Sequence, residues 1–171
     1  MSKIIWGTIA GPIVALLLVL TCPMEASATD AQGVIRALEA SFAAAVRAGD
    51  VDQIMAKYTV SDALVVFDVD PPRQYTGWQA YKEHWQKFLA VCKDTPTMKI
   101  SDLEIYGGDR YAYSHSIQHF ACTDAKGAKV EMTMRATDAY RKVNGKWLIA
   151  HEHLSAPIDL ATGKADLTSK P

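Results

Sequence analysis

Between residues 31 and 92, apolar residues at helical spacing alternate with one short apolar run that is typical of a strand. Apolar residues recur at helical spacing through residues 31–48, which predicts an amphipathic helix that Gly49 ends. Asp50 is a typical N-cap for a second helix, residues 51–58. The apolar run of residues 63–70 predicts a strand that ends at Pro71-Pro72.

A third helix is predicted over residues 77–92. Thr76 is its expected N-cap, and Gln79 three residues later completes a capping box. An apolar stripe runs along this helix and comprises Trp78, Tyr81, Trp85, Phe88, Leu89 and Cys92. Such a stripe usually packs in a core, but aromatic side chains also line ligand pockets, and Trp85 is our candidate for that second role.

After Pro96 the apolar pattern changes to a period of two, which predicts four antiparallel strands. Within residues 97–106 the parity slips, so a bulge is expected near Ser101-Asp102. Asn144-Gly145 predicts a tight hairpin turn before the last strand. Helices followed by strands indicate an α+β fold with the helices packed on one face of a curved sheet.

The first 28 residues read as a cleaved signal peptide. A lysine precedes a long apolar run, and Ala26-Ser27-Ala28 fits the small-x-small rule for cleavage. A membrane anchor over residues 4–20 and a lipid anchor on Cys22 are the alternatives. We expect a periplasmic or secreted protein with one domain over residues 29–171, of which 157–171 form a polar tail, and no membrane association after cleavage.

Charge and cysteine content narrow the partners and the compartment. The net charge is −1 and no basic patch stands out, so a nucleic-acid partner is not expected. Cleavage would leave two cysteines, Cys92 and Cys122, in an oxidising compartment. We predict a disulfide between them, since both lie at predicted ends of elements; two separate buried thiols are the alternative.

The last strand runs from apolar residues directly into three titratable ones. Strict alternation would place His151 and His153 on the face of Trp147 and Ile149, at the edge of a pocket, and Glu152 on the opposite face. We therefore predict that His153 transfers protons and that His151 binds ligand. An H-x-H step can also hold a metal ion, but a third protein ligand is not evident, so no metal is predicted.

Two other strands supply further pocket candidates. Arg135 shares a face with Thr137, and an inward arginine could bind a carboxylate or steady an oxyanion; a surface ion pair with Glu131 is the alternative. His115 lies on the face of Tyr111 and Tyr113, where it is either a ligand-binding residue or a hydrogen-bonded core histidine. If these residues point inward, an apolar set faces outward: Val130, Met132, Met134, Tyr140, Leu148, Ala150 and Leu154. That face predicts a homodimer.

Three stretches, residues 48–68, 71–85 and 140–155, resemble the SnoaL-like and ketosteroid-isomerase-like branch of the nuclear transport factor 2-like superfamily. The resemblance implies a cone-shaped sheet around about three helices, one large pocket and frequent homodimers. Members include isomerases, cyclases, dehydratases and non-catalytic binding domains. The tyrosine donor of the resembling isomerases corresponds to Phe42 here, and their aspartate base lies close to Asp68, so steroid isomerisation does not transfer intact.

Asp68 is the candidate general base at the pocket mouth, although it could instead cap the turn into Pro71-Pro72. No G-x-S-x-G elbow or phosphate-binding glycine loop is present, and export argues against nucleotide cofactors, so none is expected. The sequence predicts a domain that binds a small, partly apolar organic molecule, with cofactor-independent acid–base chemistry of the isomerase, dehydratase or cyclase type. The alternative is a non-catalytic binding or assembly module.

Overall fold

The computed structural model describes residues 24–169 of the chain. Three helices and six strands follow one another in this part: α1 (Met24–Ala48), α2 (Val51–Met55), β1 (Val65–Phe67), β2 (Tyr75–Thr76), α3 (Trp78–Leu89), β3 (Thr97–Gly107), β4 (Tyr111–Thr123), β5 (Lys129–Val143) and β6 (Lys146–Ser155). The predicted α+β class is confirmed. No helix in the described range is both long and apolar enough to cross a membrane.

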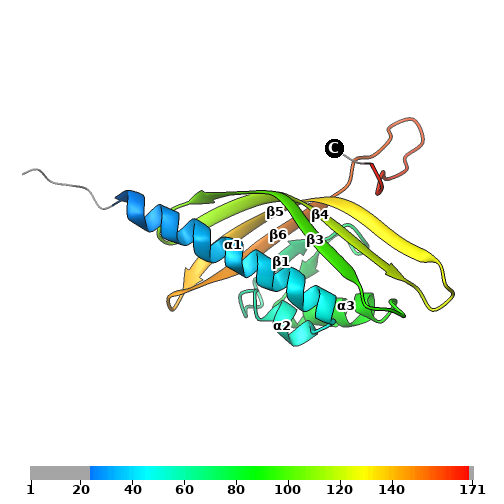
Figure 1. Ribbon diagram of the computed structural model, residues 1–171, viewed down its shortest axis with the longest axis horizontal. Helices are drawn as coiled ribbons and strands as arrows, with labels where there is room; N and C mark the ends of the chain where they lie inside the picture. Colours follow the sequence, from blue (N-terminus) through cyan, green and yellow to red (C-terminus); the bar gives the residue numbers. More distant parts are fainter. Residues whose placement is uncertain (1–23, 170–171) are drawn as a thin grey trace, which may run out of the picture.

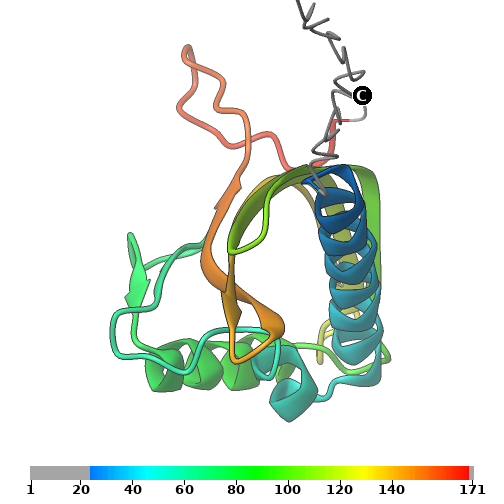
Figure 2. The same cartoon turned by 90° about the vertical axis from the view of Figure 1, so that its left-hand side faces the viewer.

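The six strands form one curved sheet in the order β2-β1-β6-β5-β4-β3. Neighbouring strands are antiparallel except β1 and β6, which run parallel and are far apart in the chain. Helix α1 lies along β3, and α2 and α3 pack together across the open side of the curve (Figure 1, Figure 2). This is the predicted cone.

Local sequence signals explain most of the element ends. Asp50 caps α2, with its Oδ1 accepting a hydrogen bond from the Gln53 N–H at 3.0 Å. Asn144 and Gly145 have φ values of 49° and 80°, as a two-residue hairpin turn of mirror-image type requires. The predicted capping box is wrong: Gly77 is the N-cap of α3 without a side-chain hydrogen bond, and Gln79 instead donates to Glu83.

The bulge predicted in β3 is confirmed. The pairing of β3 with β4 shifts between Ser101 and Glu104, and Asp102 has a positive φ of 51°. Ile100 and Leu103 lie on either side of this shift, which explains why the apolar parity of the sequence slips there.

A second bulge, in β6, was not predicted. Consecutive residues Ala139 and Tyr140 of β5 pair with His151 and Ile149 of β6, so Ala150 is the extra residue. An extra residue reverses which side chains face the helices. Trp147 and Ile149 are buried as expected, but beyond the bulge the buried side chains are Glu152 and Leu154.

On β4 and β5, as in β6 beyond the bulge, the concave face of the sheet carries residues of the opposite parity to those predicted. Met134, Tyr140 and Leu154, which were expected to face outward, are buried against the helices. Ser114, Ser116 and Gln118 form a buried polar column on β4, while the histidines of that strand lie on the other face. The predicted outward set is thus wrong for Met134, Tyr140 and Leu154, whereas Leu148, between buried Trp147 and Ile149, faces outward as expected.

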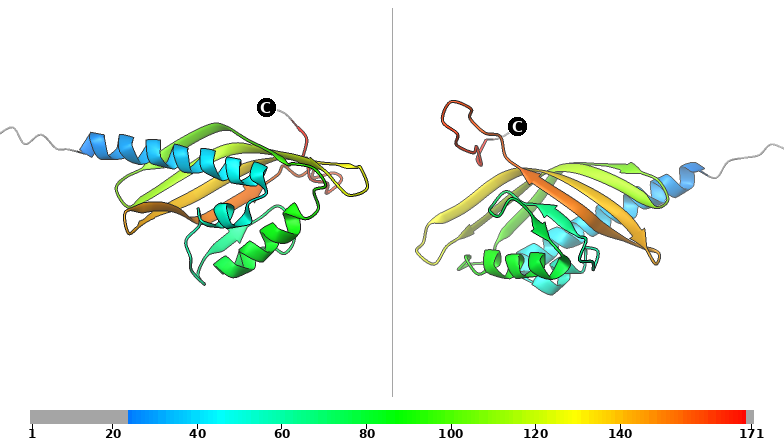
Figure 3. Two further views of the ribbon diagram at one scale, coloured as in Figure 1. Left: turned by 60° about the horizontal axis from the view of Figure 1, so that its bottom comes forward. Right: turned by 180° about the vertical axis from the view of Figure 1, so that it is seen from behind.

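One disulfide and one backbone hydrogen bond connect segments that are distant in the chain. Cys92 and Cys122 form a disulfide with a Cα–Cα distance of 5.6 Å, which confirms the predicted bond. The segment after β6 projects away from α3 and returns to β5, where the Thr133 N–H donates to the Leu167 carbonyl at 2.7 Å (Figure 3). Most of the predicted signal peptide lies outside the described residues, and its expected cleavage position, after Ala28, falls within α1.

Candidate functional site

A cavity lies between the helices and the concave face of the sheet. Its walls are aromatic side chains from α1, α3 and β4 and methionines from β3 and β5, with a group of titratable residues at one end. The cavity leaves about 40 Å³ accessible to the centres of water molecules, so it holds only a few waters in this conformation. The predicted pocket is present but narrow.

Asp68 follows β1 directly, so the end of that strand places its carboxylate at the cavity. The side chain is 8% exposed, and its Oδ2 lies 3.3 Å from Nε2 of His84. Oδ1 accepts a hydrogen bond from the Val69 N–H at 2.7 Å. Burial would raise the pKa of Asp68, but the hydrogen bond and charge of His84, with the Val69 N–H and the Tyr81 hydroxyl, lower it below its usual value.

Glu152 is turned inward by the bulge at Ala150 and is 1% exposed. The hydroxyls of Tyr58 and Tyr81 both donate to its Oε2, at 2.8 and 3.0 Å. Burial and the charge of Asp68 raise the pKa of Glu152 to about 8, although both tyrosines act in the opposite direction. Glu152 is therefore largely protonated at neutral pH, beside a carboxylate that is ionised.

Tyr81 connects the two carboxyl groups. Its hydroxyl lies 3.0 Å from Oε2 of Glu152 and 3.1 Å from Oδ2 of Asp68. One hydroxyl proton can serve only one acceptor fully, so a proton on Glu152 allows Tyr81 to donate to Asp68. We call Tyr58, Asp68, Tyr81, His84 and Glu152 the cavity cluster.

Helix geometry aligns the α3 members of the cavity cluster. Tyr81 and His84 are three residues apart and stack at 5.6 Å between ring centroids, so both face the sheet. Trp85, one residue further, packs edge-on against Phe42 of α1 at 5.9 Å. Tyr58 reaches the site from the turn after α2, where it forms an isolated bridge with Ile149 of β6.

A second buried acidic group lies between α1 and strands β4 and β5. Tyr140 donates to Oε1 of Glu39 at 2.9 Å, and the Ser114 hydroxyl lies 2.7 Å from Tyr140 and 3.4 Å from Asp138. Burial raises the pKa of Glu39 to about 7 and raises that of Asp138 well above its usual value, with Glu152 and Glu39 adding to the latter shift. We call Glu39, Ser114, Asp138 and Tyr140 the α1 cluster.

Several buried polar atoms have no hydrogen-bond partner among the described residues. They are Nε1 of Trp85, Oγ of Ser116, Nε2 of Gln118 and Oδ1 of Asp138. Trp85 and Gln118 line the cavity, and both unpartnered atoms are donors. An unsatisfied buried donor costs about 1–3 kcal/mol, so an acceptor within the cavity would stabilise the protein.

Three ligand atoms at the cavity end could hold a metal ion. One atom each from Asp68, Asp70 and His84 lies within 4.8 Å of the others. Burial and the charge of Asp68 raise the pKa of Asp70, a repulsion that a cation would relieve. Two carboxylates and an imidazole would suit a divalent transition metal.

Of the residues predicted for the site, Asp68 and Trp85 line the cavity. His153 does not: it is exposed on the outer face, because the bulge at Ala150 reverses the alternation on which the prediction depended. It borders only a shallow surface groove, which Asp68 also reaches. His151 lies outside the cavity as well, with Nδ1 2.7 Å from the Val65 carbonyl.

Arg135, Thr137 and His115 also lie on the outer face, exposed to solvent. The pairing register sets Thr137 opposite both His115 and His153, so the predicted residues do meet, but on the convex side. Their predicted inward orientation is wrong, since the buried residues of β4 and β5 are the intervening ones.

The sequence analysis missed His84, Glu152, Tyr58 and Tyr81. His84 was detectable: it lies three residues after Tyr81 and four before Phe88, so a titratable residue falls within the apolar stripe. Glu152 was assigned to the wrong face. The bulge at Ala150 falls within a run of apolar residues, where no change in the alternation of apolar and polar residues marks it. The tyrosines looked like core residues, and their hydroxyl partners are 71 and 94 residues away.

Comparisons with known proteins agree with this architecture. The model of the SnoaL-like domain matches residues 35–159. No curated protein matches the chain. An NTF2-like protein of unknown function from Pseudomonas putida KT2440 is 32% identical, with a TM-score of 0.75 over 85% of this chain and 99% of that one.

More distant solved structures share the fold alone. A protein from Xanthomonas campestris, provisionally named a calcium/calmodulin-dependent protein kinase II association domain, is 24% identical with a TM-score of 0.62, over 72% of this chain and 85% of that one. A protein from Novosphingobium aromaticivorans, provisionally named a scytalone dehydratase, is 15% identical with a TM-score of 0.67, over 76% and 86%. The chain belongs to the SnoaL-like domain family, within the NTF2-like superfamily.

Proposed function

We propose that this protein is a cofactor-independent acid–base enzyme that moves a proton on a small, partly apolar organic molecule bound in the cone cavity. The observation that carries the proposal is the pair Asp68 and Glu152, joined by Tyr81, whose pKa values are shifted in opposite directions. Two carboxyl groups held in different protonation states at the same pH supply a base and an acid to one substrate.

Four members of the cavity cluster have a role in this reaction, and the fifth, Tyr58, holds Glu152 in place by its hydrogen bond. Asp68 accepts a proton from a C–H or O–H group of the substrate, and His84 holds the carboxylate in position at 3.3 Å. Protonated Glu152 donates a proton to the developing oxyanion or leaving hydroxyl, and Tyr81 acts as a hydrogen-bond donor, so one proton enters the substrate for each that leaves. Isomerisation and dehydration share these steps.

The proposal is tested by proton exchange, which requires no knowledge of the natural substrate. Small ketones are incubated with the protein in D2O, and deuterium incorporation next to the carbonyl is followed by NMR. We expect exchange above background with the parent protein and none with Asp68→Asn. Equal rates with Asp68→Asn and the parent would overturn the assignment of Asp68 as base.

A second candidate function is a non-catalytic binding or assembly module of the same fold. The narrow cavity favours it, because its own aromatic and methionine side chains fill most of the space. Such a module would show no Asp68-dependent exchange with any ketone, while ligand binding or self-association would survive in Asp68→Asn.

We further propose export and a homodimer formed through the outer face of the sheet. The disulfide fits an oxidising compartment. The exposed aromatic residues Phe67, Tyr106, Tyr111 and Tyr113 favour self-association through this face. Light scattering at micromolar concentration tests the dimer, and the intact mass of the exported protein tests cleavage after Ala28; a monomer or an uncleaved mass would contradict each.

A further inference from the structure

We infer that the cavity selects an organic cation that also carries an uncharged oxygen acceptor, such as an amino ketone, and rejects carboxylates and phosphates. The inference rests on the proposed function, because it names the substrate class of the same cavity. It replaces the anionic ligand expected when Arg135 was placed inside the cone.

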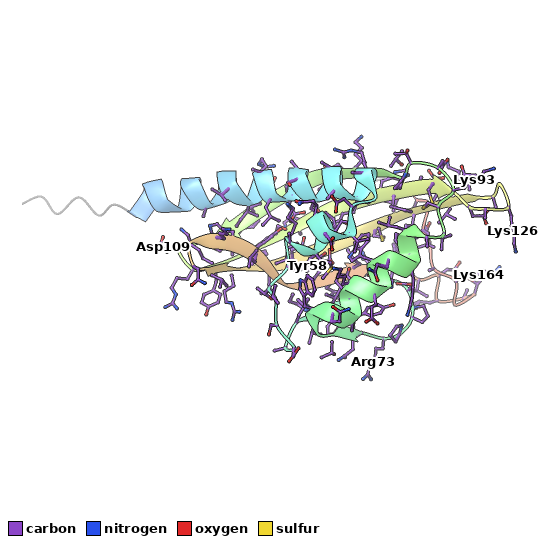
Figure 4. The ribbon with its side chains drawn as sticks, turned by 90° about the horizontal axis from the view of Figure 1, so that it is seen from below. Tyr58, Arg73, Lys93, Asp109, Lys126 and Lys164 are labelled. Carbon is purple, nitrogen blue, oxygen red and sulfur yellow. A yellow bond between two sulfur atoms is a disulfide. The ribbon has the colours of Figure 1, made fainter. Side chains whose placement is uncertain are left out.

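The charges around the cavity carry the first part of the inference. The acidic residues Asp68 and Asp70 line it beside the neutral acid Glu152, and no lysine or arginine does so within residues 24–169. His84 is the one basic side chain in the lining. The labelled cations Arg73, Lys93, Lys126 and Lys164 lie at the periphery of the molecule, whereas Tyr58 lies near its centre (Figure 4). An anion would therefore enter a site of its own sign.

The apolar lining is also suited to a cation. Trp85 and Phe88 pack edge to face at 5.7 Å between centroids, and Phe88 and Phe120 lie 4.8 Å apart. The negative faces of aromatic rings attract ammonium groups, and more strongly when both are removed from water. Methionines such as Met132 and Met134 are flexible and polarisable, so they can rearrange to admit a ligand larger than the present space.

Two unpartnered donors carry the second part. Trp85 is 7% exposed and Gln118 is 2% exposed, both line the cavity, and neither Nε1 of Trp85 nor Nε2 of Gln118 has an acceptor in the described chain. A ligand carbonyl or hydroxyl oxygen supplies the missing acceptor, while its ammonium group meets the carboxylates. A hydrocarbon amine satisfies only one of these two requirements.

The test compares three ligands that share a phenyl ketone and differ in charge: phenacylamine, phenacyl alcohol and phenylglyoxylate. Binding to the full mature chain is measured by NMR titration at about pH 6, where the amine is protonated. A second set of smaller ligands, aminoacetone, hydroxyacetone and pyruvate, shows whether the phenyl group is too large for the cavity. Asp68→Asn is the test variant, and Asp62→Asn, which alters an exposed aspartate, is the matched control.

We expect the amine of each set to bind about tenfold more tightly than the alcohol, the range for a charged hydrogen bond, and the acid not to bind. Asp68→Asn should remove most of the amine's advantage and Asp62→Asn none of it. Trp85→Phe keeps a ring but loses the N–H, so it should weaken phenacylamine several-fold more than phenethylamine, which has no carbonyl and loses only the difference between the two rings.

The inference would be overturned by tighter binding of either acid, by equal binding of amine and alcohol, or by the failure of all six ligands to bind. These results are separable from failure of the proposed function. Selective amine binding without Asp68-dependent exchange would support the ligand class and contradict the enzyme. Exchange that depends on Asp68, together with tighter binding of the acids than of the amines, would do the reverse.

Discussion

The cavity cluster and the α1 cluster are built from the same parts but differ in two components. Each holds two carboxyl groups linked through hydroxyl groups in the interior of the cone, that of Tyr81 in the cavity cluster and those of Tyr140 and Ser114 in the α1 cluster. Only the cavity cluster has an imidazole, His84, and a backbone N–H, from Val69, directed at one carboxylate. Burial raises the pKa of Glu39, Asp138 and Glu152, whereas the pKa of Asp68 lies below its usual value. The comparison indicates that burial alone favours the protonated form of a carboxyl group. A buried carboxylate base therefore needs hydrogen-bond donors directed at it.

The largest expected difference between the clusters is in proton exchange. Asp68→Asn should reduce exchange by roughly 10²- to 10⁴-fold, the usual contribution of a general base. Asp138→Asn, the same change in the α1 cluster, should leave exchange within about threefold of the parent, because Asp138 does not line the cavity and cannot reach a substrate bound there. NMR rates for both variants test the contrast, and similar losses in the two would remove it.

The next effect is on stability. The folded-state pKa of Glu39 is about 7 against an ordinary 4.5, so between these values the unfolded chain releases a proton that the folded chain retains. Stability therefore falls as pH rises through this window. Glu39→Gln should remove this loss, which amounts to roughly 3 kcal/mol of unfolding free energy between pH 4 and pH 8.

Urea unfolding at the two pH values measures this difference. Glu104→Gln, which alters an exposed glutamate of β3, is the matched control and should follow the parent. If Glu39→Gln kept the parent's pH dependence, Glu39 would not be a neutral buried acid.

A smaller effect is expected at Glu152. Its pKa of about 8 means that the acid form is lost as pH rises through that value, so exchange should decline there, by about tenfold per pH unit at most. Glu152→Gln should be slower than the parent and should lack the alkaline decline. An alkaline decline that persists in Glu152→Gln would assign the titration to another group.

The smallest effect separates the tyrosines. Tyr58→Phe removes a 2.8 Å hydrogen bond that lowers the pKa of Glu152, so the alkaline decline should move to higher pH by about one unit or less. Tyr140→Phe, the corresponding change in the α1 cluster, should not move it. The pH profiles of exchange for both variants are the measurement, and a shift toward lower pH in Tyr58→Phe would contradict the assignment.

Local signals in the sequence predicted the fold, whereas non-local contacts assemble the site. Asp50, Gly49, the turn at Asn144-Gly145 and the bulge at Asp102 each have a cause within a few residues, and all were predicted correctly. The predicted capping box is wrong because the N-cap of α3 is Gly77 and not Thr76. Gly77 has a positive φ, which glycine adopts more readily than threonine.

The candidate site was predictable only in part. Asp68 and Trp85 were found because a strand end and an apolar stripe are visible in the sequence. His153 and Arg135 were misplaced because orientation depends on strand register and on a bulge, neither of which the order of apolar residues determines. The partners of Glu152 lie 71 and 94 residues away, beyond any local pattern.

The extra residue at Ala150 has a consequence for how this scaffold acquires new chemistry. Deletion of Ala150 would leave the other side chains of β6 on their present faces, because the residues on either side of the bulge already pair with consecutive residues of β5. If Ala150 instead paired as an ordinary strand residue, the segment after it would slip by one position, so His151 and His153 would face the helices and Glu152 would face solvent. A change in strand pairing, without any substitution, would thus exchange a buried carboxylic acid for two imidazoles.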